Sequence, residues 1–335
     1  MSKIKIITDS CCDLSKEMIE ELGITVLPLM ITVDGETFRE TYDKTADEFY
    51  EILLNAKETP KHAAINPTTF LEAYQQAIDE GYTDIITVTL NSLGSVTYNN
   101  SILAKDELFE TNPELEDKIR IFNLDSKCYT VFYGYPIMES VKKINKGATA
   151  EDIVAYLEDW FNVCAVYVVP YNLKFAKKSG RISAAAAFAG ELLGLKPIIE
   201  FADGVTTTID KIRGEKNIVP KLIECIEKRM TPQTPYLLIH GRDDTLAKEV
   251  EKEMIKKTGK KAELNLGDVH FVASAYLNGY SLGVSLAPPY KFKIPDGVLS
   301  ENNTLKIVVT NTSANWYVHT DYFKKWKTEE TKNVT

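Results

Sequence analysis

The stretch TDIITVTLNSLGSVTYNN (83–100) contains the features that decide the fold. Its apolar run, rich in β-branched residues, predicts a buried strand. The run stops at Asn91 and Ser92. Ser95 and Thr97 follow, and a helical pattern then begins. A strand that ends in small polar groups just before a helix is typical of an open α/β sheet, in which ligands bind beyond the carboxyl ends of the strands.

The same alternation of strand and helix patterns runs through the first half of the chain. Apolar runs of strand length alternate with amphipathic segments that begin at capping residues and often end at glycines. This order predicts a doubly wound, mainly parallel sheet flanked by helices in a first domain, residues 1–160. Strands are expected at 3–8, 62–65, 83–90 and 118–124, and helices at 13–23, 43–56, 68–81, 95–109, 128–146 and 149–161. A long apolar run at 24–33 is followed by a hairpin-type turn at Asp34-Gly35.

The second half has a different order of elements, which predicts an α+β domain with a mixed sheet over residues 161–290. Residues 291–335 form a C-terminal extension, for which we expect one strand at 304–312 and a frayed polar end. The elements expected in the second domain are strands at 162–169 and 235–241, a hairpin at 195–214 that turns at Asp203-Gly204, helices at 183–194, 215–229 and 244–259, and strands in AELNL and GVSLA.

Composition excludes several classes of function. The 335-residue chain carries a net charge of −9, which argues against nucleic acid or an anionic membrane as the main partner. The N-terminus reads as a strand, and no apolar run reaches the roughly 18 residues that a membrane span needs, so we expect a cytoplasmic protein without membrane insertion. The five cysteines form no C-x-x-C pair, and no nucleotide, metal or hydrolase motif is present. We therefore expect no cofactor, no metal and no catalytic residue.

Three polar strand ends are expected to share one edge of the first sheet. Asn91, Ser92, Ser95 and Thr97 follow one strand, and a helix N-terminus there suits an anion. The alternative is that Ser95 only caps its own helix. Ser10 follows the first strand in TDSCCDL (8–14), where a capped helix start is again the alternative.

The third strand end is HAAINPTT (62–69), which begins at His62. A lone histidine is more often structural than functional, but three polar strand ends in one sheet favour a shared ligand site. The most basic stretch is KFAKKSGRIS (174–183). It is a solvated loop or, through Arg181, a contact to an anion or an acidic partner. The small apolar helix that follows either packs or lines a pocket for an apolar ligand.

These segments, in this order, resemble the DegV family of bacterial fatty-acid-binding proteins over about residues 3–287. The resemblance rests on ITDSCCDL, NSLGSVTYNNS, IFNLDSKCYTVFYGY, KKSGRIS, LLGLKPIIEFADG and DKIRG. It implies a two-domain protein that holds one fatty acid between its domains, with the carboxylate at the strand-end edge of the first domain. It also implies that the protein is a carrier in phospholipid metabolism, which presents this carboxylate to a separate fatty-acid kinase and is not itself an enzyme.

The sequence departs from the family pattern at three positions of the implied head-group site. His62 stands in place of the family's ligand-binding threonine, Asn91 in place of a serine, and Tyr276 in place of a histidine near the C-terminus. One hypothesis is that His62 compensates for the histidine lost at Tyr276. The alternative is an altered ligand, such as another lipid or a molecule with a different head group.

Two further readings stay open for the function. An enzyme would need a nucleophile–base pair, for which His62 or His240 near Ser92 or Cys11 would be the candidates. A regulatory protein that has lost its ligand is the other. For the carrier, the residues expected to bind the ligand are Ser92, Ser95, Asn91, His62, Tyr276, Thr97, Ser10 and Arg181.

Overall fold

The structure is a computed structural model that describes residues 3–170, 195–230, 236–240, 244–258, 263–265, 272–285, 291–294, 303–310 and 329–334. By its internal contacts the chain divides into two compact units, residues 1–228 and 229–335, and each is described by itself. The expected domain boundary near residue 160 lies inside the first unit. The expected helix 183–194 and the basic stretch around Arg181 lie outside the described residues.

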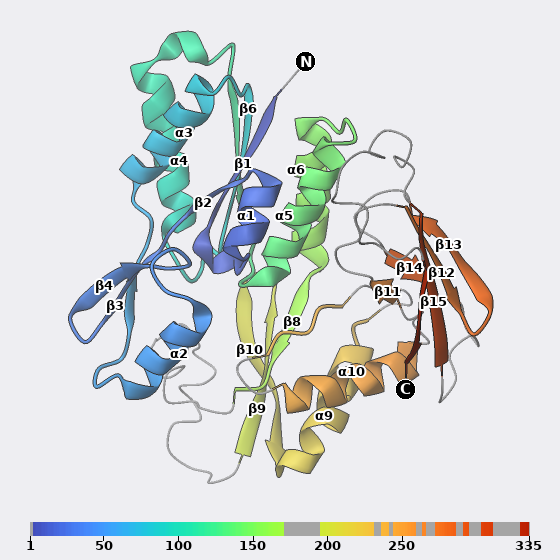
Figure 1. The fold of residues 1–335 in the computed structure, drawn as a ribbon. Coiled ribbons are helices and arrows are strands. Elements are labelled where there is room, and N and C mark those ends of the chain that lie inside the picture. The colour runs from blue at the N-terminus through green and yellow to red at the C-terminus, as the bar shows by residue number, and fades with distance from the viewer. Residues whose placement is uncertain are drawn as a thin grey trace. The chain divides into compact units, whose positions relative to one another are not determined.

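A four-stranded parallel sheet with the order β2-β1-β6-β7 lies in the first unit (Figure 1). Every residue of β6 is buried. A parallel strand covered on both faces needs apolar side chains on both sides, which explains the nearly continuous apolar run that predicted it. The strands are β1 Ile4–Asp9, β2 Thr25–Leu27, β6 Asp84–Thr89 and β7 Arg120–Asp125.

Helices cover both faces of this sheet, so the doubly wound α/β fold is confirmed (Figure 1). One face packs against α1, α5 and α6 around Val88 and Leu157, and the other packs against α3 and α4 around Ile85 and Leu108. Ser15 caps α1 by accepting from the Met18 amide. The helices are α1 Lys16–Leu22, α3 Pro67–Asp79, α4 Thr97–Thr111, α5 Val131–Ile144 and α6 Ala150–Val163.

A small antiparallel sheet, β4-β3-β5, packs against α2 Ala46–Asn55. The long apolar run 24–33 forms two strands: β2 ends at Leu27 and β3 begins at Met30. Pro28 lies between them, and its missing N–H and fixed φ interrupt a strand. The hairpin turn at Asp34-Gly35 is confirmed, with φ of 49° and 88°. The strands are β3 Met30–Val33, β4 Glu36–Arg39 and β5 Lys61–Ala63.

A second antiparallel sheet in the first unit has the order β10-β9-β8. Asp203 and Gly204 turn the β9–β10 hairpin with φ of 52° and 76°, as a two-residue turn with positive φ at both positions requires. A mixed sheet was expected here, and both described pairings are antiparallel. The elements are β8 Ala165–Val168, β9 Leu195–Ala202, β10 Val205–Arg213 and α9 Ile218–Glu227, with short 3-10 turns at Ser10–Cys12, Pro113–Leu115 and Glu215–Asn217.

The second unit contains α10 and two antiparallel sheets, β11-β14 and β13-β12-β15-β16. Two expectations are wrong here. Residues 236–240 form no strand, since an apolar run becomes a strand only where another strand pairs with it. The polar C-terminal end is not frayed at β16, because backbone pairing with β15 needs no apolar side chains. The elements are α10 Thr245–Thr258, β11 Glu263–Asn265, β12 Val272–Leu277, β13 Tyr280–Ser285, β14 Lys291–Lys293, β15 Asn303–Thr310 and β16 Glu329–Val334.

Within the described residues, none of the helices combines the length and the apolar character needed to cross a membrane.

Candidate functional site

The strands β1, β6 and β7 end at the same edge of the parallel sheet. The register places Thr8 opposite Val88, and Thr89 opposite Asp125, so the three loops that follow begin side by side. We call these loops, residues 9–13, 90–97 and 125–130, the rim. Four of the eight predicted ligand-binding residues lie in the second loop, and Ser10 lies in the first.

Ser92 is bound to a carboxylate that follows the neighbouring strand. Its hydroxyl donates to Asp125 Oδ2 over 2.5 Å, and its backbone N–H donates to Asp125 Oδ1 over 3.0 Å. The Lys127 amide donates to the same Oδ1 over 2.9 Å. Asp125 therefore fixes both the loop backbone and the direction of the Ser92 hydroxyl. Ser92 itself is half-buried, which leaves part of its side chain accessible.

Asn91 is buried and joins the rim to the β9–β10 hairpin. Its amide nitrogen donates to the Gly204 carbonyl over 2.8 Å and to the Tyr129 hydroxyl over 3.2 Å. Its side-chain oxygen accepts from the Leu93 amide over 3.1 Å. The Tyr129 ring in turn packs edge-on against Phe201 of β9. Asn91 thus holds two segments together in this structure, a role that the sequence alone did not indicate.

Gly204 sits where the hairpin comes closest to Asn91. Its φ of 76° is in the left-handed region, and a Cβ at this position would lie 3.1 Å from the Asn91 side-chain oxygen. Glycine therefore satisfies both the turn and the close approach.

Ser95 and Thr97 form a hydroxyl pair at the start of α4. Their oxygens are 2.9 Å apart, and Ser95 Oγ also accepts from the Thr97 amide over 3.3 Å. Val96, not Ser95, occupies the N-cap position and makes no side-chain cap. The Thr97 side chain is fully buried, whereas Ser95 is half-buried, so Ser95 is the member of the pair that a ligand can reach.

Ser10, unlike Ser92 and Ser95, is buried. Its hydroxyl donates to Glu40 Oε2 over 2.6 Å and accepts from the Leu29 amide over 2.9 Å. These bonds connect the end of β1 to the segments before β3 and after β4. The bonds of Ser10 are those of a structural residue, although its role toward a ligand stays a prediction.

Asp9 is the most buried acidic group of the rim and was not among the residues predicted to bind. It accepts from the Tyr133 hydroxyl over 2.6 Å, from the Cys11 amide over 3.1 Å and from the Leu90 amide over 2.7 Å. Burial nonetheless raises the pKa of Asp9 to about 6, against the lowering effect of these donors. The sequence feature that could have indicated Asp9 is a carboxylate that directly follows a predicted buried strand.

The other predicted residues lie elsewhere. His62 is exposed on β5, where its backbone pairs with Ile31. The same segment continues to Ile65, whose carbonyl accepts from the Asn100 side chain of α4 over 2.7 Å. Tyr276 belongs to β12 in the second unit. Arg181 is outside the described residues. The structure therefore brings together the residues of the first unit except His62, and the roles of His62, Tyr276 and Arg181 stay predictions.

The rim chemistry favours binding over nucleophilic catalysis. Burial, followed by the nearby charge of Asp9, raises the pKa of the Cys11 thiol well above its usual range, which disfavours the reactive thiolate. The hydroxyl of Ser92 is held by a carboxylate and not by a histidine. In the part of the chain that the structure describes, no three His, Cys, Asp or Glu side chains gather in a way that could hold a metal ion.

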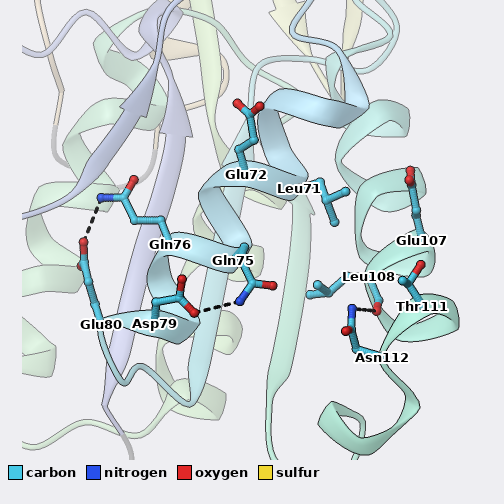
Figure 2. A pocket seen from close by; sticks show the side chains of 10 residues that line it. All are labelled: Leu71, Glu72, Gln75, Gln76, Asp79, Glu80, Glu107, Leu108, Thr111 and Asn112. Carbon is cyan, nitrogen blue, oxygen red and sulfur yellow. Dashed lines mark hydrogen bonds between the residues drawn. The ribbon is translucent and has the colours of Figure 1, made fainter.

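A separate pocket of about 630 Å³ lies between α3 and α4 (Figure 2). Two side-chain pairs along α3, Gln75 with Asp79 and Gln76 with Glu80, are hydrogen-bonded at 2.8 and 2.9 Å. None of the residues predicted to bind a ligand lines this pocket. Its lining consists of Leu71, Glu72, Gln75, Gln76, Asp79, Glu80, Glu107, Leu108, Thr111 and Asn112.

Comparison with known proteins decides the family. The family model described as "Uncharacterised protein, DegV family" matches residues 3–289. The chain belongs to the DegV family. A DegV domain-containing protein of Caldanaerobacter subterraneus subsp. tengcongensis is 30% identical over 253 residues, which cover 75% of this chain and 87% of that protein.

Two solved structures share the fold of this chain. A stearic-acid-binding protein from Eubacterium ventriosum has 26% identity and a TM-score of 0.66, and the match covers 77% of this chain and 88% of that one. DegV from Bacillus subtilis, described as a fatty acid binding protein, has 25% identity and a TM-score of 0.65, with 77% and 90% of the two chains covered. The DegV resemblance drawn from the sequence is thereby confirmed.

Proposed function

We propose that this DegV protein binds one long-chain fatty acid, or a similar single-chain lipid, with its polar head at the rim. The observation that carries the proposal is the likeness to the stearic-acid-binding protein, over 77% of the chain and at a TM-score of 0.66. Partly accessible hydroxyls at the carboxyl ends of parallel strands support it, because ligands of open α/β sheets bind at that edge. Removing the acyl chain from water would supply about 0.8 kcal/mol per methylene group.

The protein acts, in this proposal, as a carrier and not as a catalyst. The raised pKa of the half-buried Cys11 thiol and the carboxylate-bound hydroxyl of Ser92 support this part, since neither is an activated nucleophile. A separate fatty-acid kinase would receive the presented head group. Cytoplasmic location and a role in phospholipid metabolism belong to the same proposal.

Native mass spectrometry of the purified full chain tests the proposal, combined with mass spectrometry of the lipid extracted from it. We expect one single-chain lipid per protein chain, and the same ligand to be regained when a stripped sample is exposed to fatty acids. A protein that is empty as purified and that also takes up no added fatty acid or long-chain alcohol would contradict the proposal. Co-purification with a kinase, or its absence, bears only on the carrier step.

A further inference from the structure

The pocket between α3 and α4 is a groove with an apolar floor. Leu71 of α3 and the buried Leu108 of α4 point into the space between the two helices (Figure 2). Leu103 precedes Glu107 of the lining by one turn of α4, so these two side chains lie on the same face of that helix. Leu103 is 56% exposed and extends the apolar surface along α4. A groove with leucines at its base suits a partner that presents apolar side chains of its own.

The walls of this groove are acidic. Glu72 and Asp79 of α3 and Glu107 of α4 are exposed carboxylates of the lining, which contains no lysine, arginine or histidine. The whole of α3 is likewise without a basic residue. Asp79 accepts from the Gln75 amide over 2.8 Å, and a neutral donor leaves the charge of the carboxylate in place. The walls therefore present charge of one sign above the apolar floor.

Both helices end at the groove, which adds to its negative character. The last residues of α3 and α4, Asp79 and Thr111, belong to the lining. The carboxyl end of a helix favours cations, but neither helix has a basic residue in its last turn. Lys3 Nζ donates to the Glu80 carbonyl over 2.7 Å, and Lys5 lies near the same residue, because the charge of Glu80 opposes the lowering of the Lys5 pKa by burial. These two lysines serve the fourth carboxylate of the lining, and the positions beside the other three favour a cation from outside.

The groove lies at the edge of the parallel sheet opposite to the rim. α3 ends shortly before β6 begins at Asp84, and α4 ends before β7 begins at Arg120. The rim, in contrast, follows the carboxyl ends of the same strands. Within the first unit, a partner bound in the groove therefore leaves the rim uncovered.

We propose that the α3–α4 groove is a docking surface for a basic amphipathic helix of another protein. Charge complementarity selects this occupant, whereas a second copy of this chain, with a net charge of −9, brings the wrong sign. Lysine and arginine side chains can lay their aliphatic stems on leucines while their charged ends reach carboxylates. Apolar anchors at helical spacing would fill the floor between them. The inference does not depend on the proposed binding of a lipid.

Fluorescence anisotropy of a labelled synthetic peptide, LKKLLKLLKKLLKL, titrated with the full chain tests the inference. We expect Glu72→Gln combined with Glu107→Gln to weaken binding about tenfold or more, because both walls lose a charge. The matched control is Glu20→Gln combined with Glu158→Gln. It removes two exposed charges from α1 and α6, which cover the other face of the sheet, and should change the affinity by less than about twofold.

Two further comparisons test the apolar floor. Leu103→Ser should weaken binding of the peptide about threefold, whereas Leu54→Ser, at an exposed leucine of α2, should leave it unchanged. A peptide of the same composition, with its lysines spread around the helix, should bind the unmodified protein about tenfold more weakly.

Three results would overturn the inference. Equal losses in the two charge-removed pairs, or equal affinity for the two peptides, would show general attraction to an acidic protein. Binding of spermidine that depends on Glu72 and Glu107, in a chain that does not bind the amphipathic peptide, would assign the groove to a small polyamine instead.

Discussion

Ser10 and Ser92 are both serines that follow a strand of the parallel sheet, yet they differ in how much hydrogen-bonding capacity remains accessible to a ligand. Each follows a strand of the parallel sheet, and each donates its hydroxyl hydrogen to a carboxylate, at 2.6 Å to Glu40 and at 2.5 Å to Asp125. Ser10 also accepts from the Leu29 amide and is buried. Ser92 is half-buried, and its oxygen can still accept.

The comparison shows that a polar strand end becomes a ligand site through its unused hydrogen-bonding capacity. A serine whose bonds are complete contributes to stability, because its removal leaves buried partners unsatisfied. A serine with an accessible acceptor can contribute to binding. The variants below change the two serines and two further polar residues, Asp9 and His62, one at a time, and they begin with the largest expected effect.

The largest effect concerns Asp9, which precedes Ser10 and accepts from Leu90 before the second loop. Its pKa is raised from 3.8 to about 6 in the folded protein, so the folded state binds this proton more tightly than the unfolded chain does. The free energy of unfolding should therefore fall as pH rises from about 4 to about 6, by about 3 kcal/mol from this group. Asp9→Asn should make this slope shallower in urea unfolding followed over that pH range. An unchanged slope would show that Asp9 does not carry the effect. Asp13, whose pKa is raised in the same direction, keeps part of the slope in the variant.

Ser10→Ala should destabilise the fold by about 1–3 kcal/mol, because the buried Leu29 amide loses its acceptor and Glu40 loses its donor. Urea unfolding at neutral pH measures the change. The affinity of the folded fraction for lipid should stay within about twofold of that of the unmodified protein, since the Ser10 hydroxyl is buried and already hydrogen-bonded. A normal stability together with a large loss of affinity would reverse the roles assigned to the two serines.

Ser92→Ala should have the opposite effects, with a large loss of lipid affinity and a small loss of stability. We expect the affinity for dodecanoate to fall about tenfold, through loss of the hydroxyl that contacts the head group, while stability changes by less than about 1 kcal/mol. The small change in stability follows because the residue 92 amide still donates to Asp125. Titration calorimetry and urea unfolding on the same samples separate the two effects. Unaltered affinity for dodecanoate would remove Ser92 from the site.

His62→Ala should have the smallest effect, a loss of lipid affinity of less than about threefold. The His62 side chain is exposed, and water competes with any polar contact that such a side chain makes to a ligand. Lys61→Ala, on the adjacent exposed position of β5, is the matched control for general effects on this strand. A loss of about tenfold or more at His62, with a normal Lys61 variant, would instead support the idea that this histidine compensates for the one replaced at Tyr276.

Much of the fold was predictable from local patterns. The apolar run before Asn91 and the glycine stop at Gly23 indicated strand and helix correctly, because burial on both faces and helix capping leave short-range signals. The apolar run 24–33 contains Pro28, and the structure divides it there into β2 and β3. The pairing of β16 with β15 was not predictable, since backbone pairing of a polar segment leaves no side-chain pattern.

The site was predictable in position but not in chemistry. Strand-end reasoning placed Asn91 and Ser92 at the rim. It could not show that the hydrogen of Ser92 belongs to Asp125, 33 residues away, or that Asn91 is bound to Gly204, 113 residues away. Such pairings depend on the register of β6 with β7 and on the place of a hairpin tip, and neither follows from local sequence.

The most direct test of the account is titration of the lipid-free full chain with dodecanoate, carried out in parallel on the unmodified protein, Ser92→Ala and Ser10→Ala. The account predicts that the affinity falls about tenfold in Ser92→Ala and stays within about twofold in Ser10→Ala, because only Ser92 is partly accessible. The reverse order of the two variants would contradict the account.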